Sequence, residues 1–143
     1  MLMVSTIDLP DVNVWLALAD SDHAFHRPAR AYWGGLRPEG LAFCRVTMMG
    51  FLRLVTHPKV MAGRPYTRTE AWEIYRTFRA LPEVTFLKEP DDVEIHFESL
   101  EFSQRLWTDA YLAAFALSGN HRIVSFDADF QQFSGLELLL LEQ

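Results

Sequence analysis

The sequence predicts an α/β fold built as a single domain, with a central parallel β-sheet of about five strands and helices on both faces. Short apolar segments alternate along the chain with segments of helical periodicity. Strands that alternate with helices are typical of parallel sheets that are covered on both sides. The 143 residues contain no linker, repeat or low-complexity segment, and this length suits one domain over residues 1–143.

Five apolar segments are the predicted strands. They cover residues 6–10, 41–46, 84–87, 122–126 and 136–141. The single cysteine, Cys44, lies in the second segment (LAFCRV) and is predicted to be a buried strand residue. One cysteine excludes an internal disulfide bond, which fits the reducing environment of the cytoplasm.

The segments between these strands carry helix signals. Residues 67–70 (TRTE) have the spacing of a capping box in front of a helix over 71–81. Gly34 and Gly35 are expected to stop a helix within HAFHRPARAYWGGL, and Gly119 is expected to be the C-cap of the helix TDAYLAAFALSGN. Further helices are predicted over 13–19, over 47–55 and from about Asp91 onward.

Charge is distributed unevenly along the chain, whose net charge is -6. Residues 23–79 contain ten Arg or Lys and three acidic residues, whereas residues 83–101 contain seven acidic residues and one Lys. The net charge argues against general affinity for nucleic acids, but a basic middle segment can steer a polyanion to one face. Solvated helix faces explain the same distribution equally well.

The sequence carries no membrane signal. No apolar run reaches membrane-spanning length. The start, MLMVSTIDLP, has no basic residues ahead of its apolar ones, as a secretory signal would have. We therefore expect no association with membranes and a cytoplasmic location.

Aspartates stand at corresponding places in distant parts of the chain. Asp11 follows the first predicted strand, and Asp127 and Asp129 follow the fourth (IVSFDADF). Parallel sheets bind their ligands beyond the carboxyl ends of the strands, so these residues fall on the expected binding edge. Asp109 opens the most strongly helical segment, whose small residues on the same face allow close packing against the sheet.

Each of these aspartates also has a purely structural explanation. Asp11 is a candidate N-cap of the helix that follows it, and Asp109 can complement the dipole of its own helix. Asp127 can form an Asx-turn, and Asp129 can cap a short turn before FQQF. Considered one at a time, these structural roles explain the residues well.

Considered together, the aspartates predict a metal site. Two carboxylates about 4 Å apart repel each other by about 4 kcal/mol at an effective dielectric constant near 20. A hard divalent cation relieves this repulsion, and all-oxygen ligation favours Mg²⁺ or Mn²⁺. Such a site can activate water and neutralise charge on a phosphodiester. Asn13 is placed to orient a carboxylate or a ligand water.

Four segments of the chain resemble the PIN domain: DVNVWLAL, TMMGFLRLVT, TDAYLAAFAL and IVSFDADF, in this order and spacing. More specifically, they are similar to the VapC-type ribonuclease toxins of bacterial toxin–antitoxin pairs, over nearly the whole chain. The resemblance implies a Mg²⁺-dependent endoribonuclease that cleaves structured RNA such as transfer RNA. It also implies inhibition by a VapB-like antitoxin and assembly as a homodimer.

The resemblance assigns roles to individual residues. Asp11, Asp109 and Asp127 match the family's acidic residues and are implied to be the catalytic metal ligands. Asp129 and Asn13 are candidate supporting residues.

Arg53 and Met48 are two further positions that the resemblance singles out. Arg53 matches the family's Arg in FLR and is a third candidate supporting residue, to which the resemblance attaches no particular role. Met48 stands where many PIN proteins carry a Glu. Either three aspartates suffice, with Asp129 or water in support, or the metal is held weakly.

Two other classes of function are compatible with parts of the sequence. A non-catalytic PIN-fold module that binds RNA or a partner is favoured by Met48. A phosphoacceptor receiver domain also combines a parallel sheet with an acidic pocket, but it needs a late lysine, and none follows Lys88.

A partner helix or strand could dock on Trp72, Tyr75 and Arg79, which recur at i, i+3 and i+7. Packing of Trp72 and Tyr75 in the domain's own core explains that spacing equally well.

Overall fold

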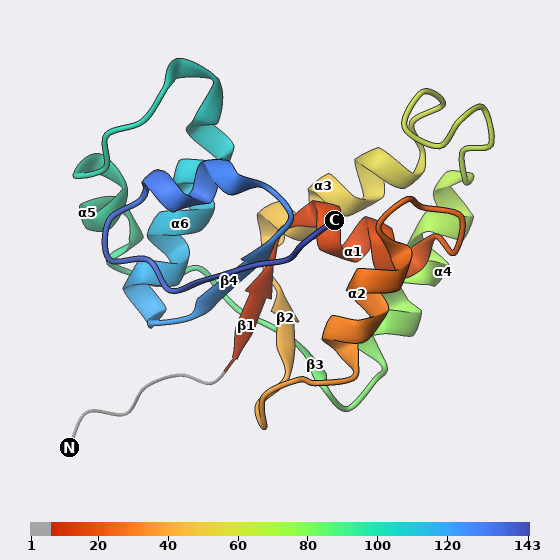
Figure 1. Cartoon of the computed structure of the whole chain (residues 1–143), viewed down its shortest axis with the longest axis horizontal. Helices are drawn as coiled ribbons and strands as arrows, with labels where there is room; N and C mark the ends of the chain where they lie inside the picture. Colours follow the sequence, from red (N-terminus) through yellow and green to blue (C-terminus); the bar gives the residue numbers. More distant parts are fainter. Residues whose placement is uncertain (1–6) are drawn as a thin grey trace.

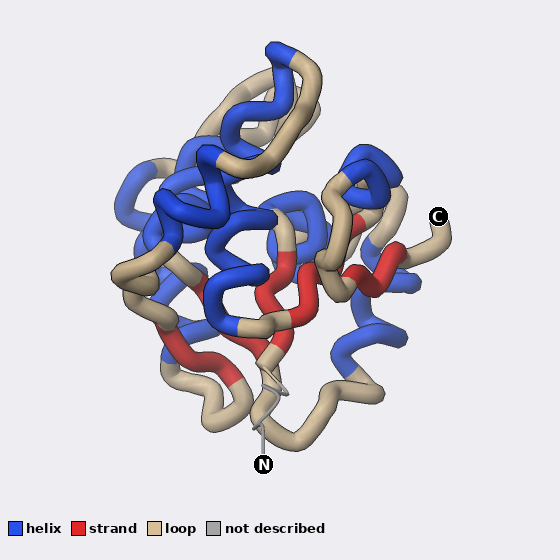
Figure 2. Tube along the Cα trace, turned by 90° about the vertical axis from the view of Figure 1, so that its left-hand side faces the viewer, coloured by secondary structure: helices blue, strands red, loops and turns tan. Residues whose placement is uncertain are grey.

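The computed structural model describes residues 7–143, which form one five-stranded sheet between two layers of helices (Figures 1 and 2). All neighbouring strands are parallel, in the order β3-β2-β1-β4-β5, which confirms the predicted fold class. Thr6, which the sequence places in the first strand, lies outside the described residues. The strands are β1 (Asp8–Pro10), β2 (Leu41–Phe43), β3 (Val84–Phe86), β4 (Arg122–Ser125) and β5 (Leu138–Leu140).

β1 is the central strand, and all three of its residues are buried. Its neighbour β4 is paired so that Pro10 lies opposite Val124, and the other neighbour β2 places Leu41 opposite Asp8. Because the strands are parallel, the residues that follow β1 and β4 emerge side by side at the carboxyl edge of the sheet.

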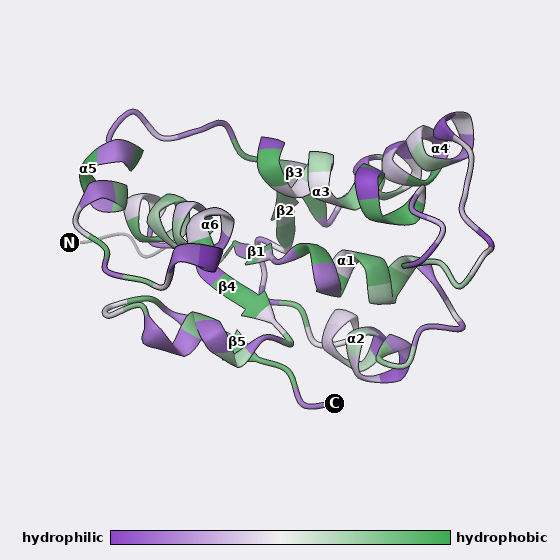
Figure 3. Cartoon of the chain, turned by 90° about the horizontal axis from the view of Figure 1, so that it is seen from above, coloured by the Kyte–Doolittle hydropathy of each residue, from purple (hydrophilic) through white to green (hydrophobic). Residues whose placement is uncertain are grey.

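Helices cover both faces of this sheet, as Figure 3 shows from above. One face carries four helices and the other carries two, together with two 3₁₀ turns. None of the helices in residues 7–143 is both long and apolar enough to cross a membrane. The first face holds α1 (Val12–Ala19), α2 (His26–Trp33), α3 (Arg45–Val55) and α4 (Arg68–Arg79), and the second holds α5 (Val93–Glu98), η1 (Gln104–Leu106), α6 (Trp107–Gly119) and η2 (Ala128–Gln132).

Each face of the sheet has its own hydrophobic core. Under α1–α4, the Trp15 ring stacks on Phe43 with 3.8 Å between ring centroids, and Tyr75 meets Phe43 edge-on at 4.9 Å. On the opposite face, Ala113 and Ala116 of α6 are completely buried. The small side chains therefore allow α6 to lie close to the sheet, as the sequence predicts.

β2 ends earlier than the sequence predicts. It stops at Phe43, and Cys44 is the N-cap of α3, so the expectation that Cys44 is a strand residue is wrong, although its side chain is buried. The Thr47 hydroxyl accepts a hydrogen bond from the Cys44 N–H at 2.9 Å and donates to the Cys44 carbonyl at 3.1 Å. This local capping starts the helix at Arg45 rather than at Thr47.

Other helix ends match the local signals in part. Gly34 is the C-cap of α2, and residues 67–70 form the predicted capping box of α4. The C-cap of α6 is Asn120, in the left-handed conformation with φ +55°, and not Gly119. Gly119 has another role: a Cβ there would lie 2.2 Å from the His121 ring, so a larger residue would displace that ring.

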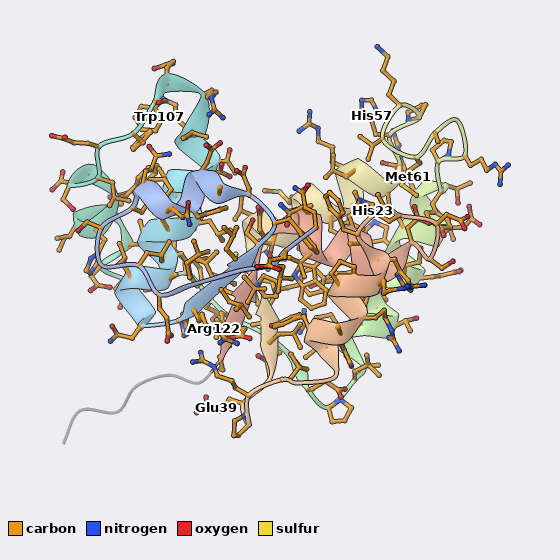
Figure 4. All side chains as sticks on the ribbon, in the orientation of Figure 1. His23, Glu39, His57, Met61, Trp107 and Arg122 are labelled. Atoms are coloured by element: carbon orange, nitrogen blue, oxygen red, sulfur yellow. The ribbon has the colours of Figure 1, made fainter. Side chains whose placement is uncertain are left out.

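The amino end of the sheet is held together by a buried ion cluster. Asp8 of β1 is completely buried, and its carboxylate accepts hydrogen bonds from Arg122 Nε at 2.9 Å and Nη2 at 2.8 Å and from the Tyr32 hydroxyl at 2.6 Å. Arg37 Nη2 lies 3.2 Å from Asp8 Oδ1. Figure 4 shows Arg122 near the opposite end of the molecule from Trp107, the first residue of α6. Asp8 is therefore a structural carboxylate, separate from the carboxyl edge.

Candidate active site at the carboxyl edge of the sheet

Asp11 joins the end of β1 to the start of α1. Its Oδ1 accepts the N–H of Val12 at 2.7 Å, so the residue caps α1 as its structural explanation predicts. Its other carboxylate oxygen, Oδ2, accepts a hydrogen bond from the Ser125 hydroxyl at 3.0 Å. Burial and the nearby negative charge of Asp127 raise the pKa of Asp11 above its ordinary value, although both hydrogen bonds oppose the rise. Capping of α1 uses only Oδ1. It therefore explains neither the placement of Oδ2 nor the raised pKa of the carboxyl group.

Ser125, the last residue of β4, connects the two strand ends. Its hydroxyl oxygen accepts hydrogen bonds from the Asp127 N–H at 2.9 Å and from Asn13 Nδ2 at 3.3 Å. The same hydroxyl donates its own hydrogen bond to Asp11 Oδ2. Asn13 Oδ1 in turn accepts the Phe126 N–H at 3.4 Å. These bonds hold the chain segments after β1 and β4 in a fixed relation across more than a hundred residues of sequence.

Asp127 and Asp129 differ in their electrostatic surroundings. Asp127 Oδ1 accepts the Asp129 N–H at 2.9 Å, which is the predicted Asx-turn at the start of η2. Asp129 Oδ2 lies 2.9 Å from Arg105 Nη1, and this ion pair holds the pKa of Asp129 below its ordinary value. Arg105 therefore pairs directly with the outer aspartate, and its charge also acts on Asp127 and Asp109.

Asp109 shows most clearly that the aspartates act on one another. It lies in the first turn of α6, half-buried. Its pKa is raised to about 6, first by burial and then by the negative charges of Asp11, Asp127 and Asp129, with a partial offset from Arg105. Residues from three separate elements thus contribute negative charge at one place, as the sequence predicts.

The chemistry of this group fits a hard divalent cation. Asp11, Asp109 and Asp127 offer only oxygen donors, and their mutual repulsion is the kind that a cation relieves. Within residues 7–143, no three His, Cys, Asp or Glu side chains are already arranged as a metal site. The charges of Asp11 and Asp127 are near enough to raise the pKa of Asp109, but the three carboxylates are not gathered around one point. Metal binding would have to bring them closer together.

Two other positions singled out in the sequence lie outside this group. Met48 is buried in the core of the first face, and its Sδ accepts a hydrogen bond from Arg45 Nη1 at 3.3 Å. Arg53 is exposed on α3 and lines a shallow hollow between α3 and α4 with Arg68 and Trp72. Neither shares the hydrogen bonds that connect Asp11 to Ser125.

The proposed docking stripe on α4 is only partly exposed. Tyr75 is buried and packs on Phe43, so its assignment to a partner groove is wrong, while the explanation by core packing is confirmed. Trp72 is 41% exposed, and Arg79 is exposed with its Nη1 donating to the Tyr75 hydroxyl at 2.7 Å. The i, i+3, i+7 spacing marks a helix face, but it does not say how deeply that face is buried.

Sequence reasoning missed two residues of the site. Ser125 is a small polar residue at the end of an apolar segment, and its position between IV and FDAD was the one available signal. Arg105 precedes α6 in a 3₁₀ turn that has no strong local signature. Both act through partners far away in sequence, so only the folded arrangement shows their roles.

Comparison with known proteins identifies the family. A family model of the PIN domain matches residues 9–136. The chain is 39% identical over 142 residues to ribonuclease VapC41 of Mycobacterium tuberculosis, covering 93% of this chain and 97% of that protein. It is 34% identical over 131 residues to ribonuclease VapC44 of the same organism, covering 83% and 84% of the two chains.

Solved structures show the same fold. VapBC2 of Rickettsia felis, bound to a DNA fragment from its promoter, superposes with a TM-score of 0.65 at 9% identity, covering 95% of this chain and 99% of that one. VapC20 of Mycobacterium tuberculosis, a toxin that cleaves the sarcin–ricin loop, superposes with a TM-score of 0.62 at 19% identity, covering 87% and 92%. Together with the family match and the two ribonucleases of higher identity, this fold shows that the chain belongs to the PIN-domain family, among its VapC members.

Proposed function

We propose that this protein is a metal-dependent endoribonuclease, the toxin of a VapBC-type pair, that hydrolyses phosphodiester bonds of structured RNA such as transfer RNA. One observation carries the proposal: Asp11, Asp109 and Asp127 come from three separate elements, and the negative charge of Asp127 raises the pKa of Asp11 and, together with that of Asp11, the pKa of Asp109 at the carboxyl edge of the sheet. Such an arrangement is unfavourable without a cation and useful with one. The similarity to VapC ribonucleases supports the same activity.

Mg²⁺ or Mn²⁺ held by Asp11, Asp109 and Asp127 would supply the positive charge that activates water and offsets charge on the phosphodiester. The protein's own contribution is positioning. Ser125 aims Asp11 Oδ2 by a hydrogen bond of 3.0 Å. Asn13 supports the same connection, since its side-chain amide donates to the Ser125 hydroxyl and accepts the Phe126 N–H.

Arg105 and Asp129 set the charge at the rim of the site. Through their ion pair of 2.9 Å, Arg105 partly offsets the negative charge around Asp109 and Asp127. Without it, an approaching RNA strand would meet a further uncompensated carboxylate. We therefore assign Asp129 a supporting role through Arg105 rather than a role as a metal ligand.

A VapB-like antitoxin is the proposed inhibitor, and both partners would meet in the cytoplasm. Several structural neighbours were solved as toxin–antitoxin complexes, among them one from Klebsiella pneumoniae with a TM-score of 0.59.

We also propose that the protein is a homodimer. Light scattering of the purified protein at tens of micromolar should give twice the mass of the 16.5 kDa chain, and a purely monomeric sample would refute the dimer.

Met48 favours one alternative, a PIN-fold module that binds RNA or a partner without cutting. Its side chain is buried and bonded to Arg45, so it adds no oxygen donor where many PIN proteins have a Glu. This alternative predicts RNA binding that does not depend on a metal and no cleavage at any metal concentration.

The deciding experiment is cleavage of a transfer-RNA pool by the purified chain, free of antitoxin, with Mg²⁺ or Mn²⁺. The test variants are Asp11→Asn and Asp109→Asn, and the matched control is Asp22→Asn in the exposed segment after α1. Asn caps a helix about as well as Asp, so a capping role alone makes Asp11→Asn nearly silent. A role as metal ligand instead abolishes cleavage in both test variants but not in the control.

The double variant should lose little more than either single one, because residues that act as one unit are not additive. Urea unfolding in EDTA separates activity from stability. Asp11→Asn should be as stable as the wild type or more so, since one repelling charge has gone. Cleavage at the wild-type rate by Asp11→Asn would overturn the proposal.

A further inference from the structure

Two arginines stack on one aromatic ring at the end of β3. The guanidinium carbon of Arg45 lies 4.6 Å from the centroid of the Phe86 ring, and that of Arg79 lies 5.0 Å from the same centroid. Arg45 is the first residue of α3, Arg79 is the last residue of α4, and Phe86 ends β3. The ring therefore gathers two positive charges that come from different helices.

We propose that Arg45 and Arg79 form a phosphate-binding site that positions the RNA strand one or two nucleotides away from the bond that is cut. This inference rests on the proposed function, because it takes RNA as the ligand. It adds a binding site outside the carboxylate group, with a phosphodiester of the RNA backbone as its ligand.

The sheet order places this arginine pair beside the carboxylates. Phe86 lies opposite Phe43 at the end of β2, and β2 lies between β3 and β1. Asp11 follows β1, so the ends of β3 and β1 are two strand spacings apart, about 10 Å. The end of β3, where the two arginines stack, and the Asp11 position after β1 therefore share one edge of the sheet, and a short piece of RNA backbone can span the two strand spacings between them.

Both guanidinium groups are available to an anion. Arg45 and Arg79 are exposed, and neither makes an ion pair with a carboxylate in residues 7–143. Arg79 is oriented by the bond from its Nη1 to the buried Tyr75 hydroxyl, and Arg45 by the bond from its Nη1 to Met48 Sδ. Each guanidinium group uses its Nη1 in these bonds, so its other N–H groups can donate to a phosphate.

Guanidinium chemistry favours phosphate as the ligand. Arginine stacks on aromatic faces and binds phosphate through two parallel hydrogen bonds. Two like charges beside one ring repel each other, and an anion between them relieves this repulsion, as a cation does at the carboxylates. Contacts to phosphates fix the register of a nucleic acid without reading its sequence. An acidic peptide offers the same charge, but the proposed nuclease site on the same edge of the sheet favours an RNA backbone, which a cation held there would also contact.

The test is RNA binding in EDTA, where no cleavage occurs, so its outcome is independent of the catalytic proposal. Anisotropy of a labelled single-stranded RNA is measured from 50 to 300 mM salt with the wild type, Arg45→Ala, Arg79→Ala and both together. The matched control is Arg64→Ala, which removes the same charge from an exposed residue between α3 and α4. Gln at positions 45 and 79 replaces Ala if urea melts show that the alanine variants are unfolded.

We expect each test variant to bind severalfold more weakly and the slope of log K against log salt to fall by about 0.7 for each lost phosphate contact. Arg45→Lys and Arg79→Lys should keep most of the slope, because they keep the charge, while losing part of the affinity. If metal-dependent cleavage occurs, the double alanine variant should raise KM with little change in kcat.

Two results would overturn the inference. One is RNA affinity of the double variant equal to that of Arg64→Ala, which would leave the arginines as packing residues or as contacts for an acidic protein. The other is a loss of affinity with an unchanged salt slope, which would show that no phosphate contact was removed. Weaker binding in EDTA without any cleavage would instead retain the phosphate site and reject the nuclease.

Discussion

The Ser125 hydroxyl donates a hydrogen bond of 3.0 Å to Asp11 Oδ2 and thereby connects the end of β4 to the end of β1. The same oxygen accepts the Asp127 N–H at 2.9 Å, so one small side chain touches two of the three proposed metal ligands. Ser125 is completely buried. Its removal should therefore affect both the stability and the ligand geometry of the site.

Ser125→Ala is expected to lower the free energy of unfolding by about 1–3 kcal/mol, because a buried carboxylate loses a donor and the Asp127 N–H loses its acceptor. It should also raise the pKa of Asp11 further and weaken metal binding. Urea unfolding in EDTA and calorimetric titration with Mn²⁺ measure the two effects. Ser99→Ala, at an exposed serine whose hydroxyl donates to the His96 carbonyl, is the control. Equal behaviour of both variants would show that the Ser125 bond is unimportant.

Mn²⁺ should stabilise the wild-type protein against heat. A ligand at ten times its Kd stabilises the folded state by about 1.4 kcal/mol, which corresponds to a rise of several degrees in Tm for a chain of this size. Thermal melts with and without millimolar Mn²⁺ are compared for the wild type and Asp11→Asn. The variant should show a smaller shift. No shift and no heat of binding in the wild type would contradict a functional metal site.

Asp109 should make stability depend on pH. Its pKa in the folded protein is about 6, above the ordinary value of 3.8, so between these values the folded chain holds a proton that the unfolded chain has released. The contribution of Asp109 to the free energy of unfolding therefore falls as pH rises from about 4 to about 6 and is level above that. In Asp109→Asn this fall should shrink by about 1 kcal/mol, a value reduced because the side chain is half-exposed. Urea melts in EDTA at several pH values give the difference.

Asp129 provides a comparison of opposite sign. Its pKa is held below the ordinary value by Arg105, so its ion pair stabilises the protein at neutral pH and is lost as pH falls through the lowered pKa. Asp129→Asn should therefore remove a stabilising contribution to the free energy of unfolding that increases with pH. Asp109→Asn should instead remove a destabilising contribution that increases with pH. If both variants shift the pH profile in the same direction, the electrostatic account of the site is wrong.

Asp8→Asn should destabilise the protein more than any change at the active site. Its carboxylate is completely buried and faces Arg122 and Arg37. Removing one partner of a buried ion pair typically costs about 3–5 kcal/mol, because the remaining charge loses its counterion. Urea unfolding measures this, with Asp22→Asn as the exposed control. A loss below about 1 kcal/mol would show that water compensates the arginines.

Local signals predicted most of the secondary structure, and they failed where a nearby side chain competed. The alternation of apolar and helical segments predicted five parallel strands, because periodicity is a property of neighbouring residues. Cys44 was misplaced because the Thr47 hydroxyl starts α3 inside the apolar run. The C-cap of α6 was misplaced by one residue, because Asn120 adopts the left-handed conformation next to Gly119.

The sequence by itself determined the fold class and the aspartates that follow β1 and β4, since a parallel sheet sends every strand end to the same edge. Only the tertiary structure decided which charges are compensated there. Arg105 pairs with Asp129, whereas Asp109 meets the charges of Asp11 and Asp127, and these residues are far apart in the chain. Electrostatic energy depends on distance in space and on burial, and a local sequence pattern encodes neither.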